Sequence, residues 1–129
     1  MKSLLMALAM LVTTNVFAAT VELGKYRATA KDDPTVIANF TLAAGGKVNL
    51  VIDAQGTKIN CNGTYAVTGN DFKSDVTCDS AAIPSASVII NIANVTPAGL
   101  RSPQGVDVPL RIPDLLGDDP VTFNLKKAD

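Results

Sequence analysis

The sequence predicts an all-β domain that folds as a small antiparallel up-and-down barrel of about eight strands. After residue 18, apolar and polar residues alternate with a period of two in one short stretch after another. Each stretch ends in Gly, Pro, Asn or Asp, which favour turns. A two-sheet β-sandwich is the alternative, and we favour the barrel because closure removes exposed strand edges.

The first 18 residues have the features of a secretory signal peptide. Lys2 carries an early positive charge, residues 4–12 are apolar, and Val16-Phe17-Ala18 suits signal peptidase. An uncleaved anchor is the alternative, but this apolar run is far shorter than the roughly 20 residues that span a bilayer. We therefore expect a signal peptide at 1–18, a single β domain at 19–129, and a periplasmic or secreted protein without a membrane span.

The first half of the domain contains four predicted strands. The first runs over about 21–30 and ends at Asp32-Asp33-Pro34, and the second runs over 36–42 and ends at Ala44-Gly45-Gly46. The third covers 48–52 and is followed by a turn at 53–56. The fourth, 59–67, contains Gly63, which indicates a bend or a bulge.

The second half contains four more strands. They are predicted at 72–78, 87–95, 106–112 and 121–125. The stretch 87–95 is apolar on both faces and needs cover on both sides. Pro109 removes a ladder donor, so its strand lies at an edge or pairs imperfectly there. The connection 96–105 is predicted to be irregular, and only Asp114-Leu115-Leu116 indicates a helical turn.

Cys61 and Cys78 are the two cysteines, and they are equidistant from a predicted hairpin turn. If Gly69-Asn70 forms a two-residue loop, the numbers of facing residues sum to 139, which places Cys61 opposite Cys78. This position is a non-hydrogen-bonded pair, where facing side chains are closest. We therefore predict a cross-strand disulfide, with free thiols or redox exchange as the alternative.

The segment 61–70, Cys-Asn-Gly-Thr-Tyr-Ala-Val-Thr-Gly-Asn, together with Phe72, resembles a hairpin of small bacterial envelope domains of the lipocalin-like or META type. Gly45-Gly46-Lys47-Val48 is similar to the glycine turn that precedes this hairpin in those families. The resemblance implies a small β domain of the envelope. The chain lacks the Gly-x-Trp common in lipocalins, so the resemblance does not extend to their ligand pocket.

Composition excludes several classes of function. Without Lys2, ten basic residues face twelve acidic ones, so the charge does not favour binding to nucleic acid. The chain has no histidine, which removes the usual general base and the commonest zinc ligand. The sequence therefore predicts a non-enzymatic protein, expected to be a monomer, with no resident cofactor.

Aspartates gather in the odd-numbered connections, which share one end of an up-and-down barrel. A weak Ca²⁺ site is one interpretation of this acidic end, and its candidate ligands are Asp32, Asp33, Asp53, Asp114, Asp118 and Asp119. A basic partner is a second interpretation, and ordinary solvated turns are the third.

The sequence favours a non-enzymatic binding module that uses loops, or the barrel mouth, to engage a protein or a small ligand. The connection 96–105 is the predicted contact surface, with Leu100 and Arg101 exposed on it. The interior is expected to be filled by side chains rather than hollow. Alternatives are a secreted enzyme inhibitor and a structural or assembly protein of the envelope.

Overall fold

The computed structural model describes residues 21–113, 117 and 119–128. The predicted signal peptide and the predicted turn at 114–116 lie outside these residues. The strands of the sheet are β1 (Gly24–Ala30), β2 (Val36–Ala43), β3 (Lys47–Ala54), β4 (Thr57–Thr68), β5 (Asp71–Cys78), β6 (Ser85–Asn91), β7 (Val106–Arg111) and β8 (Val121–Lys127).

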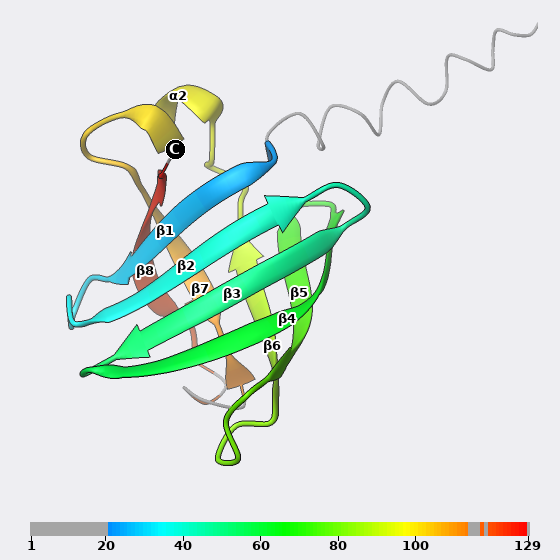
Figure 1. The fold of residues 1–129 in the computed structure, drawn as a ribbon. Helices are drawn as coiled ribbons and strands as arrows, with labels where there is room; N and C mark the ends of the chain where they lie inside the picture. Colours follow the sequence, from blue (N-terminus) through cyan, green and yellow to red (C-terminus); the bar gives the residue numbers. More distant parts are fainter. Residues whose placement is uncertain (1–20, 114–116, 118, 129) are drawn as a thin grey trace, which may run out of the picture.

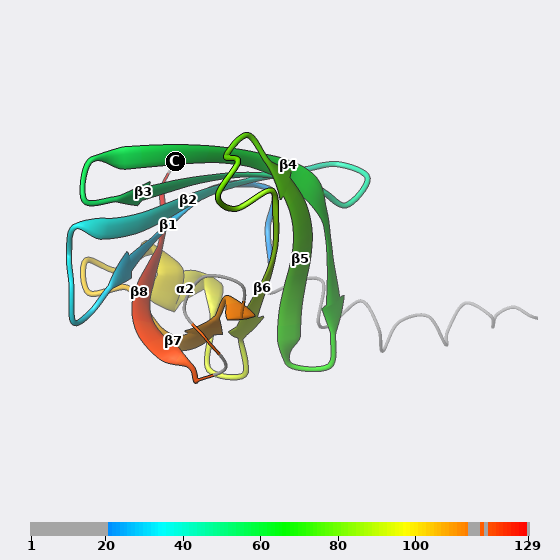
Figure 2. The same cartoon turned by 90° about the horizontal axis from the view of Figure 1, so that it is seen from below.

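The eight strands form one closed antiparallel barrel in sequence order. β1 pairs with β2 on one side and with β8 on the other, which closes the sheet. Figures 1 and 2 show the barrel from two directions. The predicted up-and-down barrel is confirmed, and the sandwich alternative is wrong.

The β4–β5 hairpin has the predicted register. Thr68 faces Asp71 beside the turn, and Cys61 faces Cys78 farther along the strands. A disulfide joins the two cysteines, whose Cα atoms are 4.0 Å apart. Gly69 adopts a φ of +61°, as a tight hairpin turn of this kind requires. The turn chemistry and the alternation of side chains therefore fix the same alignment.

The core lies inside the barrel because alternate residues of each strand point inward. Its most deeply buried large side chains are Phe123, Leu50, Ile52, Leu110, Val88 and Val108. Phe40 and Phe72 meet edge to face, with ring centroids 6.1 Å apart. Ser74 is the one buried polar residue among those described, and its hydroxyl has no hydrogen-bond partner there. Side chains fill most of the interior, as expected.

Gly63 lies in the middle of β4, where the backbones of β4 and β5 approach closely. The ladder continues through it, since Gly63 faces both Val48 and Val76, so the bulge alternative is wrong. A Cβ atom at this position would lie 1.9 Å from the carbonyl oxygen of Asp75. Both strands bend along their length (Figure 2). Glycine is therefore required here by space rather than by its φ angle.

The pairing of β6 with β7 is short. It comprises two facing pairs, Ile89 with Arg111 and Ile90 with Leu110. Pro109 directly precedes Leu110 in β7 and has no N–H group to donate to β6. The predicted imperfect pairing at Pro109 is therefore confirmed. β6 ends at Asn91 rather than at the predicted 95. Asn91 faces Asp71, the first residue of β5, and Ile92 N–H donates to the carbonyl of Asn70 in the β4–β5 turn. Beyond this point β5 has no further residue with which β6 could pair.

Candidate functional site

One end of the barrel contains a small apolar cavity beneath a cap. This end holds the start of β1 and the even-numbered connections, and α2 (Pro97–Arg101) lies across it beside the end of β8 (Figure 1). The cavity measures about 30 Å³. Its lining is almost entirely apolar and comprises Val21, Tyr26, Phe40, Leu42, Phe72, Ile90, Ile92, Val95, Leu100 and Leu125.

Helix α2 corrects the prediction that 96–105 is irregular throughout. Thr96 is its N-cap, and the Thr96 hydroxyl accepts a hydrogen bond from Gly99 N–H at 3.0 Å. Pro97 occupies the first helical turn, where its missing N–H costs nothing. A single turn is too short to produce visible helical periodicity, but Thr-Pro is a recognisable helix start that could have indicated it.

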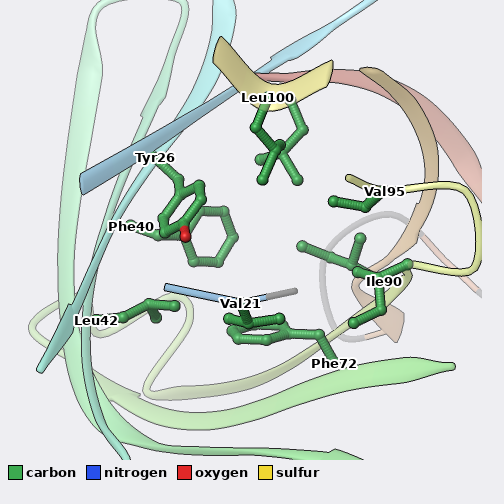
Figure 3. A pocket seen from close by; sticks show the side chains of 10 residues that line it. Val21, Tyr26, Phe40, Leu42, Phe72, Ile90, Val95 and Leu100 are labelled. Carbon is green, nitrogen blue, oxygen red and sulfur yellow. The ribbon is translucent and has the colours of Figure 1, made fainter. Parts of the chain in front are cut away.

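Leu100 lies on the inner side of this helix and is buried, which corrects the prediction that it is exposed. Only 4% of its surface is accessible, and Figure 3 shows its side chain directed into the cavity. Arg101 does lie at the surface, with half of its side chain exposed. The helical turn separates the two residues in this way because consecutive side chains point about 100° apart. Leu100 therefore lines the cavity, whereas Arg101 does not line it and lies at the surface.

The segment from Val21 to Leu23 forms the second part of the cap. Val21 lines the cavity (Figure 3). The carboxylate of Glu22 forms a bidentate ion pair with the guanidinium of Arg101. The hydroxyl of Tyr26 donates to the carbonyl of Glu22 at 2.6 Å. Both charged side chains are about half exposed, so the pair contributes about 0–1 kcal/mol. This ion pair therefore contributes little to holding the cap, which is held mainly by the burial of Leu100.

Lys127 adds a positive charge to the same end. It faces Tyr26 across the β1–β8 pair, and its ammonium lies 5.3 Å from the centre of the Tyr26 ring. This geometry is a cation–π contact. The sequence analysis missed Glu22, Tyr26 and Lys127 as parts of a site. Glu22 and Arg101 are 79 residues apart, and no local pattern indicates a contact between them.

The size of the cavity limits what it can hold while the cap is closed. A single water needs roughly 10–15 Å³ on this measure, whereas pockets for drug-sized ligands run from about 300 to 1,000 Å³. A ligand larger than a very small molecule must therefore displace Val21, Leu100 or both.

The opposite end carries the predicted acidic connections. Asp33 accepts hydrogen bonds from the N–H and the hydroxyl of Thr35, and Asp53 faces Lys58 across a turn. Asp114 and Asp118 lie outside the described residues. Within 21–113, 117 and 119–128, no three His, Cys, Asp or Glu side chains are grouped so that they could hold a metal ion. The Ca²⁺ site at Asp32, Asp33, Asp53, Asp114, Asp118 and Asp119 therefore stays a prediction.

Two exposed aspartates provide a test by pH. Hydrogen bonds from Thr35 lower the pKa of Asp33, and hydrogen bonds from Asn124 and Lys31 lower the pKa of Asp107, both from an ordinary 3.8. A lowered folded-state pKa means that the stabilisation is complete above 3.8 and is lost as the pH falls through the folded-state value. We expect the Asp33→Asn and Asp107→Asn variants to lose less stability than wild type as the pH falls below 3.8, measured by urea unfolding. An identical pH dependence would contradict these contacts.

Comparison with protein-family models, with curated proteins and with solved structures gives no match for this chain. No helix in the described part of the chain is long and apolar enough to cross a membrane. The functional assignment therefore rests on the geometry of the capped end.

Proposed function

We propose that this protein is a non-enzymatic binding module that takes a small apolar ligand into the capped end of its barrel. The observation that carries the proposal is the apolar cavity at this end of the barrel, bordered by α2 and by Val21, which lies outside the strands. Burial of apolar ligand surface supplies the driving force, worth about 25 cal/mol per Å² before the costs of association. Opening of the cap admits the ligand.

Location outside the cytoplasm, and a relationship to lipocalin-like envelope proteins, belong to the same proposal. The Cys61–Cys78 disulfide supports an oxidising compartment, and the closed eight-stranded barrel supports a lipocalin-like architecture. The inhibitor alternative requires a rigid loop that protrudes. The folding of α2 onto the barrel, with Leu100 buried, gives that alternative less support than ligand binding.

Truncation of Leu100 tests the proposal. The Leu100→Ala variant enlarges the cavity, and enlarged apolar cavities bind small apolar molecules. We expect N-phenyl-1-naphthylamine to bind this variant about tenfold more tightly than wild type, on the premise that the lost side chain contributes at least about 1.4 kcal/mol of competing burial. A fluorescence titration with this probe makes the measurement.

Leu110→Ala is the matched control, because Leu110 is fully buried but does not line the cavity. Both substitutions are expected to lower the free energy of unfolding by about 2–5 kcal/mol. Tighter probe binding by the Leu100 variant alone supports the cavity as the site. Equal gains in both variants would mean that loosened packing, not this cavity, binds the probe, and absence of binding to all three proteins would overturn the proposed function.

A further inference from the structure

A groove on the outer wall of the barrel lies over the short pairing of β6 with β7. The strands β5 to β8 form this side of the barrel (Figure 2). The groove measures about 280 Å³, and it is lined by Asp71, Ile89, Asn91, Pro109, Arg111 and Pro120. None of these residues lines the capped cavity, so the groove is a separate feature of the molecule.

The middle of the groove is apolar. Ile89 alternates with the buried Val88 and Ile90, so it points outward, and it is only partly buried. Pro109 and Pro120 add exposed apolar surface from β7 and from the residue before β8. The sequence predicts that this stretch needs cover on both faces, and Ile89 retains accessible surface on the outer one. An apolar group placed over Ile89 would gain free energy by leaving water.

Charges of both signs surround this apolar surface. Lys73 faces Ile89 from β5, and Arg111 faces it from β7. Asp71 lies two residues from Lys73 on the same face of β5, and all three charged side chains are exposed. Among the described residues, no ion pair or side-chain hydrogen bond engages any of the three. Two cations and one carboxylate are therefore available to a ligand.

We propose that this groove binds a free α-amino acid with an apolar side chain. The ligand carboxylate lies between Lys73 and Arg111, its ammonium lies beside Asp71, and its side chain covers Ile89. A simple anion would be repelled by Asp71 and a simple cation by Lys73 and Arg111, whereas a zwitterion meets an opposite charge at each end. The volume suits a ligand of this size, because sites for larger, drug-sized molecules measure about 300–1,000 Å³.

Three related probes separate the two charged contacts. L-phenylalanine carries both charges, N-acetyl-L-phenylalanine lacks the ammonium, and L-phenylalaninamide lacks the carboxylate. Each is titrated into the purified protein while NMR follows the Ile89 methyl groups. The variants are Arg111→Gln and Asp71→Asn, and Arg27→Gln on the distant strand β1 is the matched control for the loss of an exposed arginine. Thermal unfolding establishes that each variant remains folded.

We expect L-phenylalanine to bind wild type more tightly than either derivative. Arg111→Gln should weaken the binding of L-phenylalanine and of its N-acetyl derivative about three to five times, as expected for the loss of an exposed charged contact, and should not weaken that of the amide. Asp71→Asn should weaken the binding of L-phenylalanine and of the amide by a similar factor, and should not weaken that of the N-acetyl derivative. Arg27→Gln should bind all three probes like wild type.

The outcomes distinguish this inference from the proposed function. If L-phenylalanine causes no saturable shift at Ile89, the groove site is wrong, whatever N-phenyl-1-naphthylamine does at the capped cavity. If L-phenylalanine instead shifts the methyl groups of Val95 and Leu100, it binds in the capped cavity and the groove site is likewise overturned. If the three probes bind equally, or if a variant changes all three affinities by the same factor, recognition of a zwitterion is wrong.

Discussion

Replacement of Gly63 by alanine is expected to lower the free energy of unfolding by at least about 3 kcal/mol, at the upper end of the range for overpacked positions. The added Cβ atom would lie 1.9 Å from the Asp75 carbonyl oxygen and 2.7 Å from the Cα atom of Val76. Both neighbours are backbone atoms, so β4 and β5 must separate to admit it. Urea unfolding followed by circular dichroism measures the loss.

Gly69→Ala is the matched control for this substitution. Gly69 has a positive φ of +61°, but an added Cβ atom would meet nothing within 4 Å. Its expected cost is therefore conformational alone, about 1–2 kcal/mol. A cost at Gly63 no larger than the cost at Gly69 would mean that the two strands do not approach as closely as described.

Reduction of the Cys61–Cys78 disulfide is expected to lower the free energy of unfolding by about 3 kcal/mol. The cysteines are 17 residues apart in the sequence, so the bond closes a short loop in the unfolded chain. This loop lowers the conformational entropy of the unfolded state, and reduction restores that entropy. Reduction leaves the buried Cys61 side chain in place and creates no cavity, unlike a substitution. Urea unfolding with and without a phosphine reductant measures the effect.

A control excludes effects of the reductant itself. The Cys61→Ala/Cys78→Ala double variant should show the same stability with and without reductant, at a level at or below that of the reduced wild type. An unchanged unfolding midpoint on reduction of the wild type, with thiol titration showing complete reduction, would contradict a stabilising role for this bond.

The strands and the hairpin register could be predicted because both arise from local rules. Alternation with a period of two identifies a strand, and the Gly69-Asn70 turn fixes which residues face one another. The aligned cysteines then supply an independent check. Closure followed from the general disadvantage of open strand edges rather than from any single residue.

The capped end could not be predicted in the same way. Helix α2 has one turn, which is too short to show periodicity, and the burial of Leu100 depends on where that turn packs. The contact between Glu22 and Arg101 joins segments that are 79 residues apart, and it exists because the barrel brings the start of β1 close to the β6–β7 connection. Sequence reasoning therefore gave the wrong orientation for Leu100.

Methyl-resolved NMR during titration with N-phenyl-1-naphthylamine tests most directly whether the capped cavity is the binding site. The account predicts that the largest shifts occur at the methyl groups of Val21, Val95, Leu100 and Ile90, which line the cavity. The methyl groups of Val88 and Val108, which are buried elsewhere in the barrel, should shift little. Saturable shifts confined to residues outside the cavity, or no shifts with this probe, would contradict it.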